Sequence, residues 1–136
     1  TGVICAATTV NAAVNPALVA DVLDKERKGG WGRVGHACEY ETSMMLHLHP
    51  ELVQMDKAYR DIGQLKLKYF NWDFPEPSAY AWQDWWSRFS KEGICGDAAA
   101  ATPEFGRRMF ELTASRFVEL LREFQTIPIK PRVDHH

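Results

Sequence analysis

The hydrophobic period of the chain changes near residue 10. The opening run "TGVICAATTV" is short, apolar and rich in β-branched residues, and it predicts a buried parallel strand ending near Thr9. Apolar residues then recur at helical spacing from Pro16 to Lys28, and the glycines at 29–30 suit a helix end. We therefore expect a strand followed by a helix.

A second helix is predicted in the middle of the chain. The glycine-rich residues 29–35 indicate a loop, and Trp31 within it is a large apolar side chain that must be buried or held for a ligand. The pattern of residues that follows predicts a helix that begins near Glu41 or Thr42 and ends before Pro50.

The last part of the chain predicts a long loop, a short strand and a long helix. Prolines interrupt the aromatic-rich residues 65–86, so we expect a loop with a short helix around 80–89 and then a short strand at "GIC", 93–95. Thr102 can cap a final helix with Pro103 in its first position. The apolar face of this helix comprises Met109, Leu112, Phe117, Leu120, Leu121 and Phe124. Together the elements predict an α/β fold.

Composition adds limits to this picture. The chain has 136 residues, 46% of them hydrophobic, which suits one domain with a real core. A net charge of −2 with both signs interleaved argues against nucleic-acid and membrane partners, and no apolar run approaches the roughly 18 residues of a membrane span. Three dispersed cysteines without a CxxC suggest no disulfide framework or zinc finger and favour a reducing, cytoplasmic setting. We interpret residues 134–136 as the remnant of an affinity tag and 1–133 as the domain.

Candidate chemistry concentrates in "GHACEYETSMMLHLHPELV", residues 35–53. His36 lies between small residues that leave room for a ligand, although a structural role for a loop histidine remains open. Glu39 and Glu41 are two residues apart and would diverge by about 200° on a helix. If the helix starts at Glu41 or Thr42, Glu39 stays on the loop beside His36 and both can point into one cavity. Residues 41–43 then satisfy N–H groups of the first turn.

Other reactive side chains in the sequence favour structural roles. His47 and His49 would point to different helix faces, so we expect surface or core-edge histidines rather than a metal pair. Cys95 is expected to be a small buried residue, since no neighbouring base is visible. A separate possibility is Thr1, which could act as a nucleophile with its own amine as base if proteolysis exposes it.

Two long stretches resemble the creatininase (creatinine amidohydrolase) family. The segment at 35–53 is similar to the family's "HAGExETSxMLxLxPELV", and "GICGDAAAATPEFGRRMFELTASRFVELLREF" is similar to its closing "GVxGDPxxATxExG" turn and long terminal helix. The resemblance covers roughly residues 1–125 and corresponds to the carboxyl-terminal half of a family member. It implies a three-layer α/β/α fold, of which this chain is about half.

The resemblance also implies a function and a set of site residues. It implies a metal-dependent amidohydrolase that cuts a non-peptide C–N bond in a cyclic or small linear amide, with His36 as the catalytic proton-transfer residue. Glu39 matches an acidic ligand of a divalent Zn, Mn or Fe centre whose other ligands lie mostly outside this chain. Trp31 corresponds to a tryptophan over the substrate, and Cys38 replaces the glycine of "HAGE" beside the pocket.

The half-length match leaves the partners open. The amino-terminal half is expected either as a missing segment or as a companion chain that internal cleavage just before Thr1 separates from this one. We favour the companion chain, because an opening strand without neighbours would expose its edges. The complete unit is expected to form a homo-oligomer, hexamer-like by resemblance. Two alternatives remain: a non-catalytic scaffold subunit of the same fold, and the hydrolase with Thr1 as nucleophile.

Overall fold

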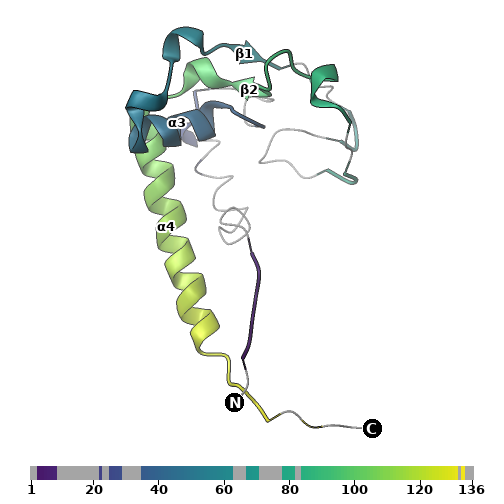
Figure 1. The fold of residues 1–136 in the computed structure, drawn as a ribbon, viewed down its shortest axis with the longest axis vertical. Coiled ribbons are helices and arrows are strands. Elements are labelled where there is room, and N and C mark those ends of the chain that lie inside the picture. Colours follow the sequence, from purple (N-terminus) through teal and green to yellow (C-terminus); the bar gives the residue numbers. More distant parts are fainter. Residues whose placement is uncertain are drawn as a thin grey trace.

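The computed structural model describes residues 3–8, 22, 25–28, 35–62, 67–70, 78–81, 84–131 and 133. In these residues a group of short elements lies over one end of a long helix (Figure 1). The α-helices are α3 (Glu39–Leu48) and α4 (Pro103–Gln125), and the strands are β1 (Arg60–Asp61) and β2 (Gly96–Asp97). Single 3-10 turns span Pro50–Leu52, Met55–Lys57, Trp86–Arg88 and Ala98–Ala100.

Helix α4 begins where its sequence predicts. The side-chain oxygen of Thr102 accepts the backbone N–H of Phe105 at 3.2 Å, and Pro103 is the first helical residue. Proline suits this position because the first N–H of a helix has no partner within it. At the other end, the N–H of Thr126 donates to Glu123 at 2.9 Å, and Pro128 follows two residues later. The prediction of a long, capped terminal helix is confirmed.

Helix α3 begins two residues earlier than the cap preferences predict. Its first residue is Glu39 rather than Glu41 or Thr42, and the N–H of Thr42 donates to the carbonyl of Cys38 at 3.0 Å. Cys38 thus serves as the N-cap residue in extended conformation, although cysteine is not a preferred cap. The acidic side chains of Glu39 and Glu41 both lie in the first turn, where the positive end of the helix favours them. The predicted end before Pro50 is confirmed.

Helices α3 and α4 are in close contact at Ser43 and Gly106. A Cβ atom on Gly106 would lie 1.8 Å from the carbonyl oxygen of Ser43, so only glycine permits this contact. The Ser43 hydroxyl is fully buried and accepts the N–H of Thr102 at 2.9 Å. Ser43 therefore bonds the start of α4 rather than the first turn of its own helix, which corrects the sequence expectation. The difference follows from the earlier start of α3, which moves Ser43 into the helix interior.

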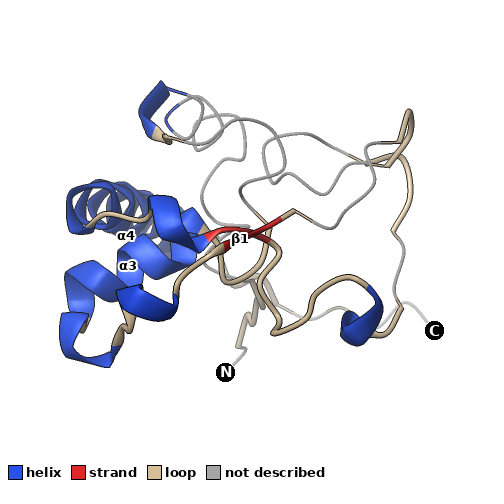
Figure 2. Ribbon diagram, turned by 90° about the horizontal axis from the view of Figure 1, so that it is seen from above, coloured by secondary structure: helices blue, strands red, loops and turns tan. Residues whose placement is uncertain are grey.

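The main apolar cluster lies beside this crossing. Val22, Phe105 and Met109 form it, and Met109 has no exposed surface. Tyr40, Met44 and Leu112 pack around the cluster. Figure 2 shows α3 beside α4 in the view from above, and Figure 1 shows α3 at the upper end of α4. Helix α3, which follows the turn at 36–38, therefore packs on this apolar cluster.

The observed sheet differs from the predicted one. Strands β1 and β2 are antiparallel, with Arg60 opposite Asp97 and Asp61 opposite Gly96. Residues 3–8 are exposed and form no strand, so the predicted buried parallel strand is wrong for the described part of that run. A strand needs a neighbouring strand for its backbone N–H and C=O groups, and residues 3–8 belong to none of the β-ladders or isolated bridges among the described residues.

The remaining sequence predictions have mixed outcomes. Val22, Lys25 and Glu26 are helical, as expected, whereas Arg27 and Lys28 at the predicted helix end are not, and the other residues of the predicted helix lie outside the described residues. The "GIC" strand is displaced, because Cys95 forms an isolated bridge and β2 starts at the next residue. The short helix expected at 80–89 is a single turn at Trp86–Arg88. The described residues show a mixed α/β arrangement, and three layers remain a prediction.

Candidate functional site

The backbone of His36 is tied to a fully buried residue. Its N–H donates to the carbonyl of Cys95 at 2.9 Å, and the N–H of Cys95 donates back at 2.8 Å, forming an antiparallel bridge. Cys95 is completely buried, as the sequence predicted, whereas His36 is exposed. The structure thus anchors the main chain of His36 and leaves its imidazole at the surface.

A tight turn leads from His36 into α3. Ala37 has φ of 47°, in the left-handed region that non-glycine residues rarely adopt, at a cost of about 1 kcal/mol. The N–H of Ala37 donates to a carboxylate oxygen of Glu41, one turn along the chain. The turn therefore contains a strained residue and a side-chain hydrogen bond that holds it.

An open cavity of about 450 Å³ lies beside this turn. Its lining is largely apolar, with a few polar groups, which is the usual composition of small-molecule sites. The lining residues are His36, Ala37, Glu41, Thr42, Met45, Leu52, Val53 and Gln54. The cavity therefore combines an imidazole, a carboxylate and apolar walls within a short stretch of sequence.

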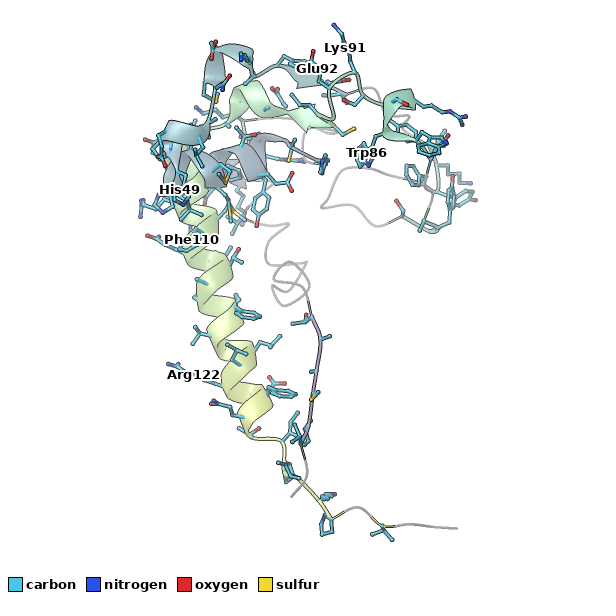
Figure 3. The ribbon with its side chains drawn as sticks, in the orientation of Figure 1. His49, Trp86, Lys91, Glu92, Phe110 and Arg122 are labelled. Carbon is cyan, nitrogen blue, oxygen red and sulfur yellow. The ribbon has the colours of Figure 1, made fainter. Side chains whose placement is uncertain are left out.

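A tryptophan from a distant part of the chain packs on His36. The ring centroids of His36 and Trp86 are 4.8 Å apart, with 33° between the ring planes. Phe89 meets Trp86 edge-on at 6.4 Å. Figure 3 shows Trp86 on the side of the upper elements away from α4. The imidazole consequently has an aromatic neighbour as well as a cavity beside it.

An ion pair braces the segment that carries Trp86. Arg88 donates to both carboxylate oxygens of Asp84 at 2.8 and 2.9 Å, and Asp84 also accepts the N–H of Trp85 at 2.8 Å. The hydrogen bond from Trp85 and then the charge and bonds of Arg88 lower the pKa of Asp84. Asp84 therefore favours its ionised form, which is the form that holds this turn.

Glu39 points into the protein instead of sharing the cavity. Its side chain is 1% exposed, and Oε1 accepts the backbone N–H of Lys28 at 2.9 Å. Glu39 is absent from the cavity lining, where Glu41 is found instead. The expectation that Glu39 remains on the loop is wrong because α3 already includes it, and residues two apart on a helix diverge.

The described residues do not by themselves form a metal centre. Within the part of the chain that the structure describes, no three His, Cys, Asp or Glu side chains cluster in a way that could hold a metal ion. Glu39, the ligand suggested by resemblance, has one oxygen engaged by Lys28. No catalytic step through a metal can therefore be built from these residues alone.

Cys38, the other residue that the resemblance places beside the substrate pocket and that the structure describes, lies outside the cavity lining. Cys38 is 1% exposed and has its pKa raised chiefly by burial, which keeps the thiol neutral. Trp31 and Thr1 lie outside the described residues.

His47 packs near Phe110 at 5.8 Å between ring centroids, and His49 bonds an oxygen of Glu51 at 3.1 Å. The two histidines thus have different neighbours.

Sequence reasoning missed part of the site. Trp86 lies 50 residues after His36, and only the general richness in aromatics drew attention to its region. Met45, an apolar residue that the sequence does not mark as part of a site, is 39% exposed and lines the cavity. Residues 52–54 carried no chemical signal, because two of them are ordinary aliphatic side chains.

Comparison with known proteins gives the family. A family model matches residues 5–121, and its description is "Creatininase: Creatinine amidohydrolase". The match therefore includes the residues that line the cavity and those at the contact between α3 and α4. The chain belongs to the creatininase family. Searches of the curated proteins and of the solved structures returned no match. Among the described residues, neither helix is both apolar enough and long enough to cross a membrane.

Proposed function

We propose that this chain forms part of an amidohydrolase that cuts a non-peptide C–N bond in a cyclic or small linear amide. Family membership supports hydrolysis of an amide. The observation that carries the proposal is the placement of His36, whose backbone is fixed to buried Cys95 while its ring borders a cavity. A cavity of about 450 Å³ suits a small molecule better than a polypeptide.

His36 is the proton-transfer residue in this proposal. An imidazole can accept and donate a proton near neutral pH, which suits delivery of a proton to the nitrogen that leaves when an amide is cut. The exposed ring lies where a bound amide in the cavity could reach it. Met45 and Val53 provide apolar wall that would limit the water around such a substrate.

We further propose that the enzyme depends on a divalent Zn, Mn or Fe ion held mostly by residues outside this chain. Such an ion, when bound, lowers the pKa of a water molecule and polarises the scissile carbonyl. Glu39 is this chain's candidate contribution, and it would have to exchange or share its bond with Lys28. The proposal rests on the family, because the described residues contain no metal cluster.

A companion polypeptide segment is part of the same proposal. Val3 is 84% exposed and Leu52, on the cavity lining, is 65% exposed, which are large fractions for aliphatic side chains. Coverage by a segment that carries the metal ligands would bury these groups and close the open side of the cavity. Assembly into a homo-oligomer and a reducing, cytoplasmic location remain predictions.

The proposal is tested on the complete native complex purified from cells that express the chain. Native mass spectrometry with metal analysis should show a companion chain and about one or two divalent ions per unit. Release of amine or ring opening is then measured on creatinine, hydantoin and formamide, before and after a chelator. We expect hydrolysis that the chelator abolishes and a divalent ion restores.

Each alternative gives a different result in this experiment. A complex that carries no metal and hydrolyses none of the amides would support the scaffold subunit and contradict the proposal. Hydrolysis that survives the chelator and is lost in Thr1→Ala would identify the threonine hydrolase instead.

A further inference from the structure

We propose that Glu41 is a positioning residue for His36 and acts through the left-handed turn at Ala37. The inference rests on the proposed function, since it gives His36 its significance for catalysis. Sequence reasoning assigned Glu41 only to the first turn of a helix. The structure adds a bond from this carboxylate to the residue that directly follows His36.

Ala37 adopts a backbone conformation that needs support from its neighbours. A φ of 47° is unfavourable for alanine, so neighbouring contacts must hold the residue there. The bond from the Ala37 N–H to Glu41 is such a contact, because it fixes the peptide that joins His36 to Ala37. Glu41 is itself held by α3, whose first turns pack on the main apolar cluster through Tyr40 and Met44.

The backbone of His36 is held through Cys95 and through Glu41. Its backbone exchanges two hydrogen bonds with Cys95, and the peptide that contains the His36 carbonyl is held a second time through the Ala37 N–H, which donates to Glu41. With the main chain fixed at both points, the side chain leaves the backbone in a set direction, toward Trp86 at 4.8 Å. Loss of the Glu41 bond would leave this peptide held only at the His36 carbonyl, by the N–H of Cys95, so that it could tilt about that bond and move the ring off Trp86.

The hydrogen bond from Ala37 to Glu41 differs from the general effect of a negative charge at a helix start. Any negative charge in the first turn favours the helix, whatever the length of its side chain. The bond to Ala37 instead requires an acceptor oxygen at the reach of a glutamate side chain. Glutamine keeps that reach without the charge, whereas aspartate keeps the charge and is one methylene shorter.

The test compares Glu41→Gln with Glu41→Asp in the full chain by NMR. The readouts are the imidazole proton signals of His36, which the ring of Trp86 displaces, and hydrogen exchange at the Ala37 amide. Trp86→Leu gives the signal position of an unstacked His36, and Glu104→Gln, in the first turn of α4, is the matched control. Neither substitution at position 41 removes core packing, so both variants should fold.

We expect Glu41→Gln to keep the His36 signals and the Ala37 protection of the native chain. Glu41→Asp should move the signals more than halfway toward those of Trp86→Leu and speed Ala37 exchange roughly tenfold or more. The inference is overturned if the aspartate variant keeps the native signals, or if the glutamine variant loses them as fully as aspartate does. Glu104→Gln should change neither readout.

Activity gives a second, separable readout. In the complete enzyme, Glu41→Asp should lower kcat roughly tenfold or more with little change in KM, because a small displacement of a catalytic group is costly. An unchanged kcat in this variant counts against positioning. Failure of the proposed function would instead appear as full activity in His36→Ala, whatever the NMR signals of the variants at position 41.

Discussion

The two halves of α4 continue one amphipathic pattern but lie in different surroundings. In the first half, 103–113, Phe105 is 7% exposed and Met109 has no exposed surface. In the second half, 114–125, Val118 is 43% and Leu121 is 45% exposed, and the helix extends away from α3 and the sheet (Figure 1). The periodicity of apolar residues therefore predicts which face of a helix is apolar, but it does not predict how much of that face other parts of the chain bury.

The same contrast explains where the candidate site lies. The covered half of α4 supports α3 through Gly106 and Met109, and α3 in turn holds the turn at 36–38. No residue of α4 lines the cavity, so α4 influences it only through its contact with α3. Stability and site geometry should therefore depend on the first half.

The largest effect should come from truncating the most buried apolar side chain of α4. Met109→Ala is expected to lower the free energy of unfolding by about 3 kcal/mol, because it leaves a cavity in the main apolar cluster. Leu121→Ala, on the exposed half, should cost less than about 1 kcal/mol. Urea unfolding of both variants measures the difference, and equal losses would contradict the contrast between the halves.

A smaller but still substantial effect is expected at the helix crossing. Gly106→Ala places a Cβ against the backbone of Ser43 and should destabilise the fold by about 2 kcal/mol. Arg107→Ala, which removes only an exposed pair with Glu111, should cost about 0.5 kcal/mol. Thermal unfolding compares the two neighbours; a Gly106→Ala variant as stable as Arg107→Ala would show that the helices do not meet here.

The next effect concerns the start of the covered half. Thr102→Ala should cost about 1 kcal/mol through loss of the bond to the Phe105 N–H, whereas Thr102→Ser keeps an oxygen in place. Far-ultraviolet circular dichroism during urea titration follows both variants. Identical midpoints for alanine and serine would argue against the cap.

The smallest effect is a pH dependence at the start of α3. Burial raises the pKa of Cys38 above its ordinary value of 9.0, so the folded state favours the neutral thiol. Its contribution to stability is complete below the unfolded pKa and is lost as pH rises toward the folded pKa. The stability difference between the native chain and Cys38→Ala should therefore shrink as pH rises above this ordinary value. A difference that grows over this range would contradict the assignment.

The sequence predicts local features of this fold better than long-range ones. The cap at Thr102, the proline at 103 and the stop before Pro50 depend on a few adjacent residues, and all three are confirmed. The parallel strand predicted at the chain start depends on strands distant in sequence, and residues 3–8, the described part of that run, form no strand. The start of α3 was misplaced because a cysteine replaces the usual polar cap.

The candidate site follows the same rule. His36 could be singled out from its motif, because the signal lies within a short run. The exchange of Glu39 for Glu41 at the cavity follows from a two-residue shift in a helix start. The stack with Trp86 depends on a fold that brings together residues 50 positions apart, so no local pattern could indicate it.

The central claim is that His36 performs proton transfer during amide hydrolysis, and one comparison tests it most directly. The complete enzyme is assayed as His36→Ala and as His49→Ala, the latter an exposed histidine bonded to Glu51 outside the cavity. We predict that kcat falls roughly a hundredfold or more in His36→Ala at unchanged metal content, and stays within about twofold in His49→Ala. Undiminished kcat in His36→Ala would contradict the account.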